Sequence, residues 1–170
     1  MNKNAERFAA WLMETHRMQG FAMENAGDPQ HTVIFRTQLP VGPALAETPS
    51  HDDDTTTGDA PADAMHPRRI PLGILLDDTI FALIRVNFAT RALDDTNAFA
   101  IQQFLAQRNY EDKLFKYYLA PDTTILLDAC IPQPQNAFRP DFLWACAELV
   151  AREAREQAEA IFERVGRGLP

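Results

Sequence analysis

Two pairs of closely spaced apolar segments constrain most strongly what this chain of 170 residues can fold into. In each pair, two runs rich in apolar, β-branched and aromatic residues are separated only by a short turn signal, Asp77 and Asp78 in the first pair and Pro121 and Asp122 in the second. The runs are 70–76 with 79–88, and 113–119 with 123–131. A connection this short joins antiparallel neighbours, so the pattern predicts two β-hairpins.

Alternation within the second of these runs indicates which side of the sheet is buried. Between residues 80 and 87, one set of alternate positions holds Ile80, Ala82, Ile84 and Val86, whereas the other set includes Arg85. Side chains along a strand point alternately to its two faces. We therefore expect the face of Ile80, Ala82, Ile84 and Val86 to be covered by a helix.

Helical periodicity predicts three helices around these hairpins. The first covers 5–17, where Phe8 and Leu12 recur at helical spacing. The second follows the capping oxygens of 94–96 and extends to Arg108. The third is a long helix after Pro140 that Asp141 is predicted to cap, and Gly166 stands where a glycine commonly ends a helix.

One further strand is predicted at 31–39, so the order of elements is α, β, β, β, α, β, β, α. Helices and strands do not alternate as they do in a parallel, doubly wound sheet. The sequence therefore predicts one α+β domain over 1–170, with a five-stranded antiparallel sheet and helices packed on it.

The segment 44–69 reads as a flexible acidic insertion between two strands. It holds six acidic and two basic residues, a Thr triplet and almost nothing able to pack in a core. Within it, His51 and the aspartates 52–54 offer metal-ligand atoms, so a metal sensor is one alternative function. Consecutive side chains point in different directions, however, so we expect a solvated loop and no metal site.

Composition and charge exclude several classes of function. The chain carries 24 acidic and 16 basic residues with no basic cluster, which disfavours nucleic-acid binding. No apolar run has the length of a membrane span or a signal peptide, so we expect a cytoplasmic protein without membrane contact. Cys130 and Cys146 are the only thiols and lack a zinc-ligand spacing, which indicates reduced core residues.

No catalytic motif is present, so we expect no enzyme, no cofactor and no catalytic residue. Ser50 is the only serine and lies in the predicted insertion, and the seven glycines form no phosphate-binding motif. Asp128, which interrupts an apolar strand, is the one carboxylate that suggests a catalytic acid. We favour instead a half-exposed strand residue paired with Lys116 or Tyr118. A small enzyme using dispersed carboxylates and histidines remains the alternative.

The second half of the chain resembles the type III secretion chaperone-like fold, and within it the YbjN-like group of bacterial sensory-transduction regulators. Three segments carry the resemblance: NAFAIQQFLAQRN at 97–109, LFKYYLAPDTTILLDACIP at 114–132 and FLWACAELVAREAREQAEAIF at 142–162. The resemblance implies a small acidic α+β domain that pairs as a homodimer and binds a segment of another protein, as a chaperone or a regulator. The insertion after Ser50 departs from the secretion chaperones.

Six apolar or aromatic residues are the predicted partner or dimer contacts. Trp11 and Met13 lie off the Phe8 and Leu12 stripe of the first helix, and Tyr117 and Tyr118 point to opposite sides of one strand. The middle helix and the strand after it form the dimer contact that the resemblance implies. Phe99, Phe104 and Tyr118 are the candidates for that contact.

Overall fold

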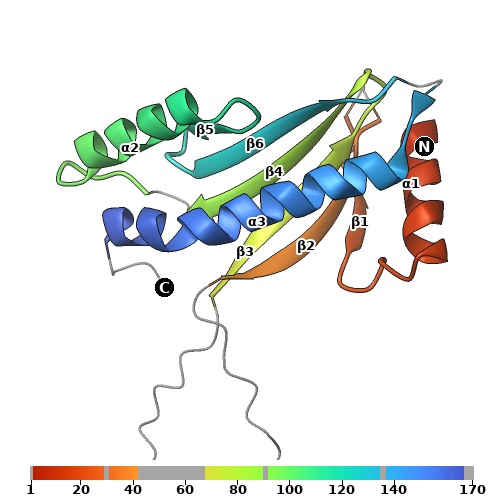
Figure 1. Ribbon diagram of the computed structural model, residues 1–170, viewed down its shortest axis with the longest axis horizontal. Helices are drawn as coiled ribbons and strands as arrows, with labels where there is room; N and C mark the ends of the chain where they lie inside the picture. Colours follow the sequence, from red (N-terminus) through yellow and green to blue (C-terminus); the bar gives the residue numbers. More distant parts are fainter. Residues whose placement is uncertain (1, 29–30, 42–67, 90–91, 135–136, 167–170) are drawn as a thin grey trace, which may run out of the picture.

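The computed structural model describes residues 2–28, 31–41, 68–89, 92–134 and 137–166. They form six strands and three helices in the order α1, β1, β2, β3, β4, α2, β5, β6, α3 (Figure 1). The helices are α1 (Lys3–Glu14), α2 (Ala98–Glu111) and α3 (Pro140–Val165). The strands are β1 (Ala22–Asn25), β2 (Val33–Val41), β3 (Arg68–Leu76), β4 (Phe81–Ala89), β5 (Lys116–Leu119) and β6 (Ile125–Pro132).

The strands form one antiparallel sheet in the order β1-β2-β3-β4-β6-β5. Both predicted hairpins are present, as β3–β4 and β5–β6, and the predicted α+β class is confirmed. Pairing of β4 with β6 joins the two hairpins into one sheet. It places residues about 40 positions apart in the sequence, such as Arg85 and Asp128, opposite each other.

The prediction of five strands was wrong, because β1 is a sixth. It pairs with β2 from Ala22 opposite Arg36 to Asn25 opposite Val33. All four residues of β1 are exposed, so this edge strand has no apolar alternation that a sequence pattern could reveal. Its main-chain pairing with β2, rather than side-chain burial, defines it.

The three helices lie on one face of the sheet. In Figure 1, α3 crosses the front of the strands, α1 lies at the right-hand end and α2 at the upper left. The core forms between them and the inward side chains of the strands, among them Phe8 on α1, Phe35 on β2 and Val150 on α3. Cys146 on α3 is buried, but the prediction of a core residue was wrong for Cys130, which is exposed because it lies on the outward side of β6. Burial in β4 alternates as predicted, with Ala82, Ile84 and Val86 inside. The prediction was wrong for Ile80, which precedes β4 in the turn and is 54% exposed.

Helix boundaries differ from the sequence prediction. Helix α1 covers Lys3–Glu14 and not 5–17, and α2 begins after Asn97, which makes no side-chain cap, and extends to Glu111. Asn2 caps α1, since its side chain accepts hydrogen bonds from the backbone N–H groups of Asn4 and Ala5. Asp141 does not cap α3: Arg139 holds the N-cap position, and Asp141 lies in the first turn with its carboxylate paired to Arg139 at 2.6 Å. A proline at the first helical position allows α3 to begin without a side-chain cap.

The predicted insertion falls mostly on 42–67, outside the described residues. Its last two residues, Arg68 and Arg69, begin β3 instead of lying in a loop. Among the described helices, none combines the length and the apolar composition that crossing a membrane requires.

Candidate functional site

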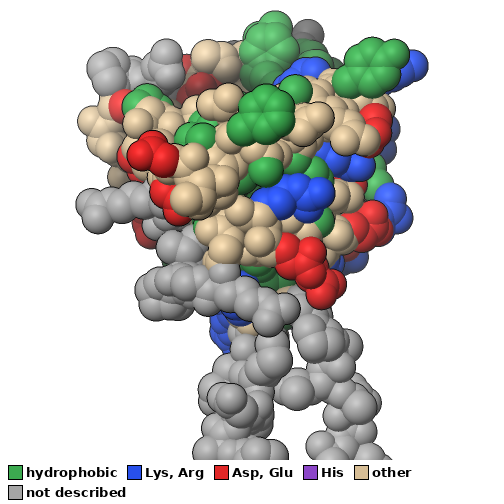
Figure 2. All heavy atoms as spheres, turned by 90° about the vertical axis from the view of Figure 1, so that its left-hand side faces the viewer, with side chains coloured by type: hydrophobic (Ala, Val, Ile, Leu, Met, Phe, Trp, Pro, Cys, Tyr) green, Lys and Arg blue, Asp and Glu red, His purple; other side chains and the backbone are tan. Residues whose placement is uncertain are grey.

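The most exposed aromatic side chains of the described chain lie on α2. Phe99 is 79% exposed and Tyr110 is 91% exposed. Residues 99, 103, 106 and 110 follow one another at helical spacing, and Gln102, Gln103, Ala106 and Gln107 are exposed beside them. We call these six residues, Phe99 to Tyr110, the α2 outer face. In Figure 2, hydrophobic side chains, aromatic rings among them, gather in the upper part of the view, where α2 lies.

The α2 outer face carries no charge. From Ala98 to Gln107 the helix has no acidic or basic residue, although the whole chain has a net charge of −8. Solvent-facing helix positions are ordinarily charged. An uncharged face with two exposed rings is therefore typical of a surface that contacts another protein.

Few side chains attach α2 to the rest of the molecule. Only Ile101 and Leu105 of this helix are buried. Asn109 adds two hydrogen bonds to the backbone of Tyr117 on β5: its Nδ2 donates to the carbonyl at 2.7 Å, and its Oδ1 accepts from the N–H at 2.8 Å. The Asn109 amide thereby occupies the free edge of β5 as a further strand would.

A polar network joins α2 to α3 beneath the helix. Arg108 donates to Glu153 at 3.0 Å and to Asp112 at 2.9 Å, and the Tyr117 hydroxyl donates to Glu153 at 2.6 Å. Burial, and next the hydrogen bond to Glu153, raise the pKa of Tyr117 above its usual range. The tyrosine therefore stays protonated and serves as a donor to the carboxylate.

The structure separates the four predicted contact residues of this region. Phe99 is exposed on α2, whereas Phe104 is half-buried beneath the guanidinium of Arg164, which lies 4.4 Å from the ring centroid. Tyr117 is 1% exposed and stacks on Phe88, so it cannot contact a partner in this conformation. Tyr118 points to the opposite side of the sheet and is half-buried.

Trp11 and Met13 lie at the other end of the molecule. Met13 is 60% exposed. Trp11 belongs to an aromatic cluster between α1 and α3, where its ring centroid lies 6.1 Å from that of Trp144. The Arg17 guanidinium covers both rings at 5.5 and 5.4 Å. Trp11 is thus already paired within the chain, through cation–π contacts.

Asp128 is paired with a cation rather than a histidine. Arg85 donates to both of its carboxylate oxygens, at 2.9 and 2.8 Å, and the Tyr118 hydroxyl donates at 2.7 Å. The predicted partner Tyr118 is confirmed, and Lys116 lies directly opposite in the strand register. The bond to Asp128 raises the pKa of Arg85, while burial raises that of Tyr118. Such a bidentate pair orients groups instead of transferring protons.

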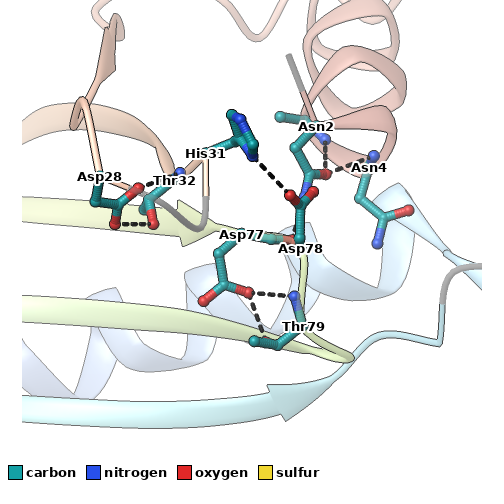
Figure 3. Close-up of polar contacts among 9 residues, drawn as sticks. Asn2, Asn4, Asp28, His31, Thr32, Asp77, Asp78 and Thr79 are labelled. Atoms are coloured by element: carbon teal, nitrogen blue, oxygen red, sulfur yellow. Dashed lines mark hydrogen bonds and ion pairs between the residues drawn. The ribbon is translucent and has the colours of Figure 1, made fainter.

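A second polar cluster fixes the end of the sheet near the start of α1 (Figure 3). The Asn2 amide donates to the carbonyl of Asp77 and to the carboxylate of Asp78 at 3.0 Å. Asp78 also pairs with His31 at 2.9 Å, across from the bond between Asp28 and Thr32. These contacts join α1 to two turns. In the part of the chain that the structure describes, no group of three or more His, Cys, Asp or Glu could hold a metal. The candidate ligands at 51–54 lie outside it.

Comparison with protein-family models, with curated proteins and with solved structures finds no match for this chain. The resemblance to the YbjN-like group therefore stays a prediction. Sequence reasoning selected Phe99 but missed Tyr110 and Asn109. The absence of charge from Ala98 to Gln107 was the available signal for an exposed contact face.

Proposed function

We propose that this chain is a non-enzymatic protein-binding module, chaperone-like or regulatory, that works as a homodimer and holds a segment of a partner protein. The exposed, uncharged α2 outer face carries the proposal. Burying one Phe or Tyr side chain contributes about 2 kcal/mol, so four rings from two copies supply a useful part of a dimer's free energy.

The α2 outer face is suited to a symmetric contact. Phe99 and Tyr110 lie eleven positions apart on the helix, which places them about 16 Å from each other along its axis. In an antiparallel pair of such helices about a two-fold axis, Phe99 of one copy meets Tyr110 of the other. Two chains of net charge −8 repel each other, and an uncharged face is where that repulsion costs least.

Partner binding is supported by the exposed edge strand. All residues of β1 are exposed, and among the described strands β2 is its only neighbour. An extended segment of another protein can add to such an edge through main-chain hydrogen bonds, without any reacting group. The resemblance to secretion chaperones agrees with this mode of binding.

Sedimentation velocity at micromolar concentration tests the dimer. We expect the wild-type chain to sediment as a dimer and the variants Phe99→Glu and Tyr110→Glu to sediment as monomers, because each places a charge in the contact. Leu149→Glu, at an exposed apolar position of α3, is the control and leaves the dimer intact. A wild-type monomer, or a dimer unaffected by both α2 substitutions, contradicts this interface.

A further inference from the structure

The face of the sheet opposite the helices has a definite chemical pattern. No described helix covers it, and the strand register places its outward side chains in rows across the sheet. One row is apolar: Ile34 pairs with Leu75, Leu75 with Leu83 and Leu83 with Cys130. All four are half-buried or exposed. We call this side of the sheet the open sheet face and these four residues its apolar row.

The charge of the open sheet face is opposite to that of the chain. Its outward-facing basic residues are Arg36, Arg69, Arg85 and Lys116, and its outward-facing acidic residues are Glu24 and Asp128. Four positive and two negative groups leave a net charge of +2. Arg36 is paired with Glu24 at 3.1 Å and Arg85 with Asp128 at 2.8 Å, so Arg69 and Lys116 carry this excess. By contrast, α3 on the other side of the sheet carries six acidic and three basic residues, a net charge of −3. A field of this sign favours an acidic ligand on the open sheet face.

Gly73 leaves the middle of this face without a side chain. It lies within β3, and its register neighbours on both sides are arginines, Arg36 and Arg85. The fold does not require glycine there: a Cβ would meet only the side chains of Leu75 at 3.4 Å and Ile34 at 3.6 Å, which is ordinary contact. A glycine inside a strand weakens it and often marks close approach by a ligand or another backbone. Here it exposes the strand beside the apolar row.

We propose that the open sheet face binds an acidic amphipathic segment of a partner protein. This inference rests on the proposed function and gives the chemistry of the partner. The apolar row takes the apolar side chains of the segment. Lys116, whose register partner Asp128 lies two residues from Cys130 on β6, faces the segment's carboxylates. Neighbouring strands lie about 4.8 Å apart, so the row extends about 14 Å, the length of roughly ten helical residues. Three or four apolar side chains on one side of the segment would cover it.

Selection from a random dodecapeptide library displayed on phage, with the full chain immobilised, tests the proposal. We expect the selected peptides to combine acidic residues with at least three apolar ones. The Kd of a fluorescein-labelled selected peptide, measured by fluorescence polarisation, should rise about tenfold in Leu83→Gln and in Leu75→Gln. The Kd should also rise in Lys116→Glu relative to the wild type, and this increase should be smaller at high salt than at low salt. Leu149→Gln, on the exposed side of α3, is the control and keeps the wild-type Kd.

Gly73→Ala separates binding from folding. A Cβ fits the fold and removes the entropy cost of glycine, so the midpoint of urea unfolding should stay or rise. The same Cβ obstructs the partner's approach, so the Kd should rise by roughly threefold or more. A variant that is at least as stable but binds more weakly supports a binding role for this position. Equal binding by Gly73→Ala and wild type contradicts it.

Three outcomes overturn the proposal. These are the selection of basic or uncharged peptides, binding of the selected peptides to Leu75→Gln and Leu83→Gln as tightly as to wild type, and the selection of no peptide. Loss of the wild-type dimer in those two variants would assign the open sheet face to a second copy of the chain, which also overturns it. The first three results leave the dimer test on α2 unchanged, so failure here is distinguishable from failure of the proposed function.

Discussion

Replacement of Asn109 tests whether the side-chain bridge between α2 and β5 stabilises the fold. Asn109→Ala removes two hydrogen bonds, of 2.7 and 2.8 Å, to the backbone of Tyr117. A neutral hydrogen bond contributes about 1 kcal/mol net, so the variant should lose about 2 kcal/mol of unfolding free energy. For a chain of this length, that corresponds to a Tm lower by about 4–8 °C.

Asn109→Asp makes the test more specific. The carboxylate can still accept from the Tyr117 N–H, but it cannot donate, and one of its oxygens then faces the Tyr117 carbonyl oxygen. Two acceptors facing each other repel, so this variant should be at least as destabilised as Asn109→Ala although it is nearly isosteric. A simple loss of side-chain volume would predict the reverse order.

Urea unfolding followed by circular dichroism measures the free energies, and hydrogen exchange of the Tyr117 amide reports the local bond. Glu156→Ala, at an exposed position of α3, is the control and should change the free energy by less than about 0.5 kcal/mol. If Asn109→Ala and Asn109→Asp both match Glu156→Ala, the bridge contributes nothing and the reasoning is refuted.

Two further predictions concern stability. Asp128→Asn should lower the free energy of unfolding in urea by about 2 kcal/mol, because it weakens three hydrogen bonds and leaves the Arg85 charge without its partner. Tyr118→Phe should lower it by about 1 kcal/mol, and equal stability of wild type and Asp128→Asn would contradict this prediction. Hydrogen bonds from the Thr32 hydroxyl and backbone hold the pKa of Asp28 below its ordinary 3.8. The ionised Asp28 therefore contributes to the free energy of unfolding above pH 3.8, and this contribution is lost as the pH falls through the lowered pKa. The free energy of unfolding of Asp28→Asn, measured as a function of pH, should therefore fall less steeply at acid pH than that of the wild type. An unchanged slope would count against the Asp28–Thr32 bond.

Much of the fold followed from periodicity alone, because burial leaves a repeating pattern. The hairpins were predictable from their short turns, and the inward side of β4 from its alternation of Ala82, Ile84 and Val86. β1 was not predictable, since none of its side chains is buried. The N-cap of α3 was misassigned because Asp141 has a residue type that commonly caps helices but lies two positions after the N-cap, Arg139.

The candidate site depended more on long-range register than on local pattern. That Arg85 meets Asp128 follows from β6 lying between β4 and β5, which a single sequence does not specify. The apolar row likewise combines four strands, each contributing one residue that looks like ordinary strand composition. Phe99 was selected through the dimer contact that the resemblance implies, and the uncharged stretch from Ala98 to Gln107 is the local signal that accompanies it.

The opposite charges of the sheet's open side and of α3 have a kinetic consequence. They give the molecule a dipole across its thin dimension, which exerts a torque on any charged body diffusing nearby. An acidic partner that approaches the α3 side is repelled, and one that approaches the open sheet face is attracted. A larger share of encounters therefore begins in a productive orientation. Dissolved salt shortens the reach of this field to about 10 Å at 0.1 M, and capture should slow accordingly.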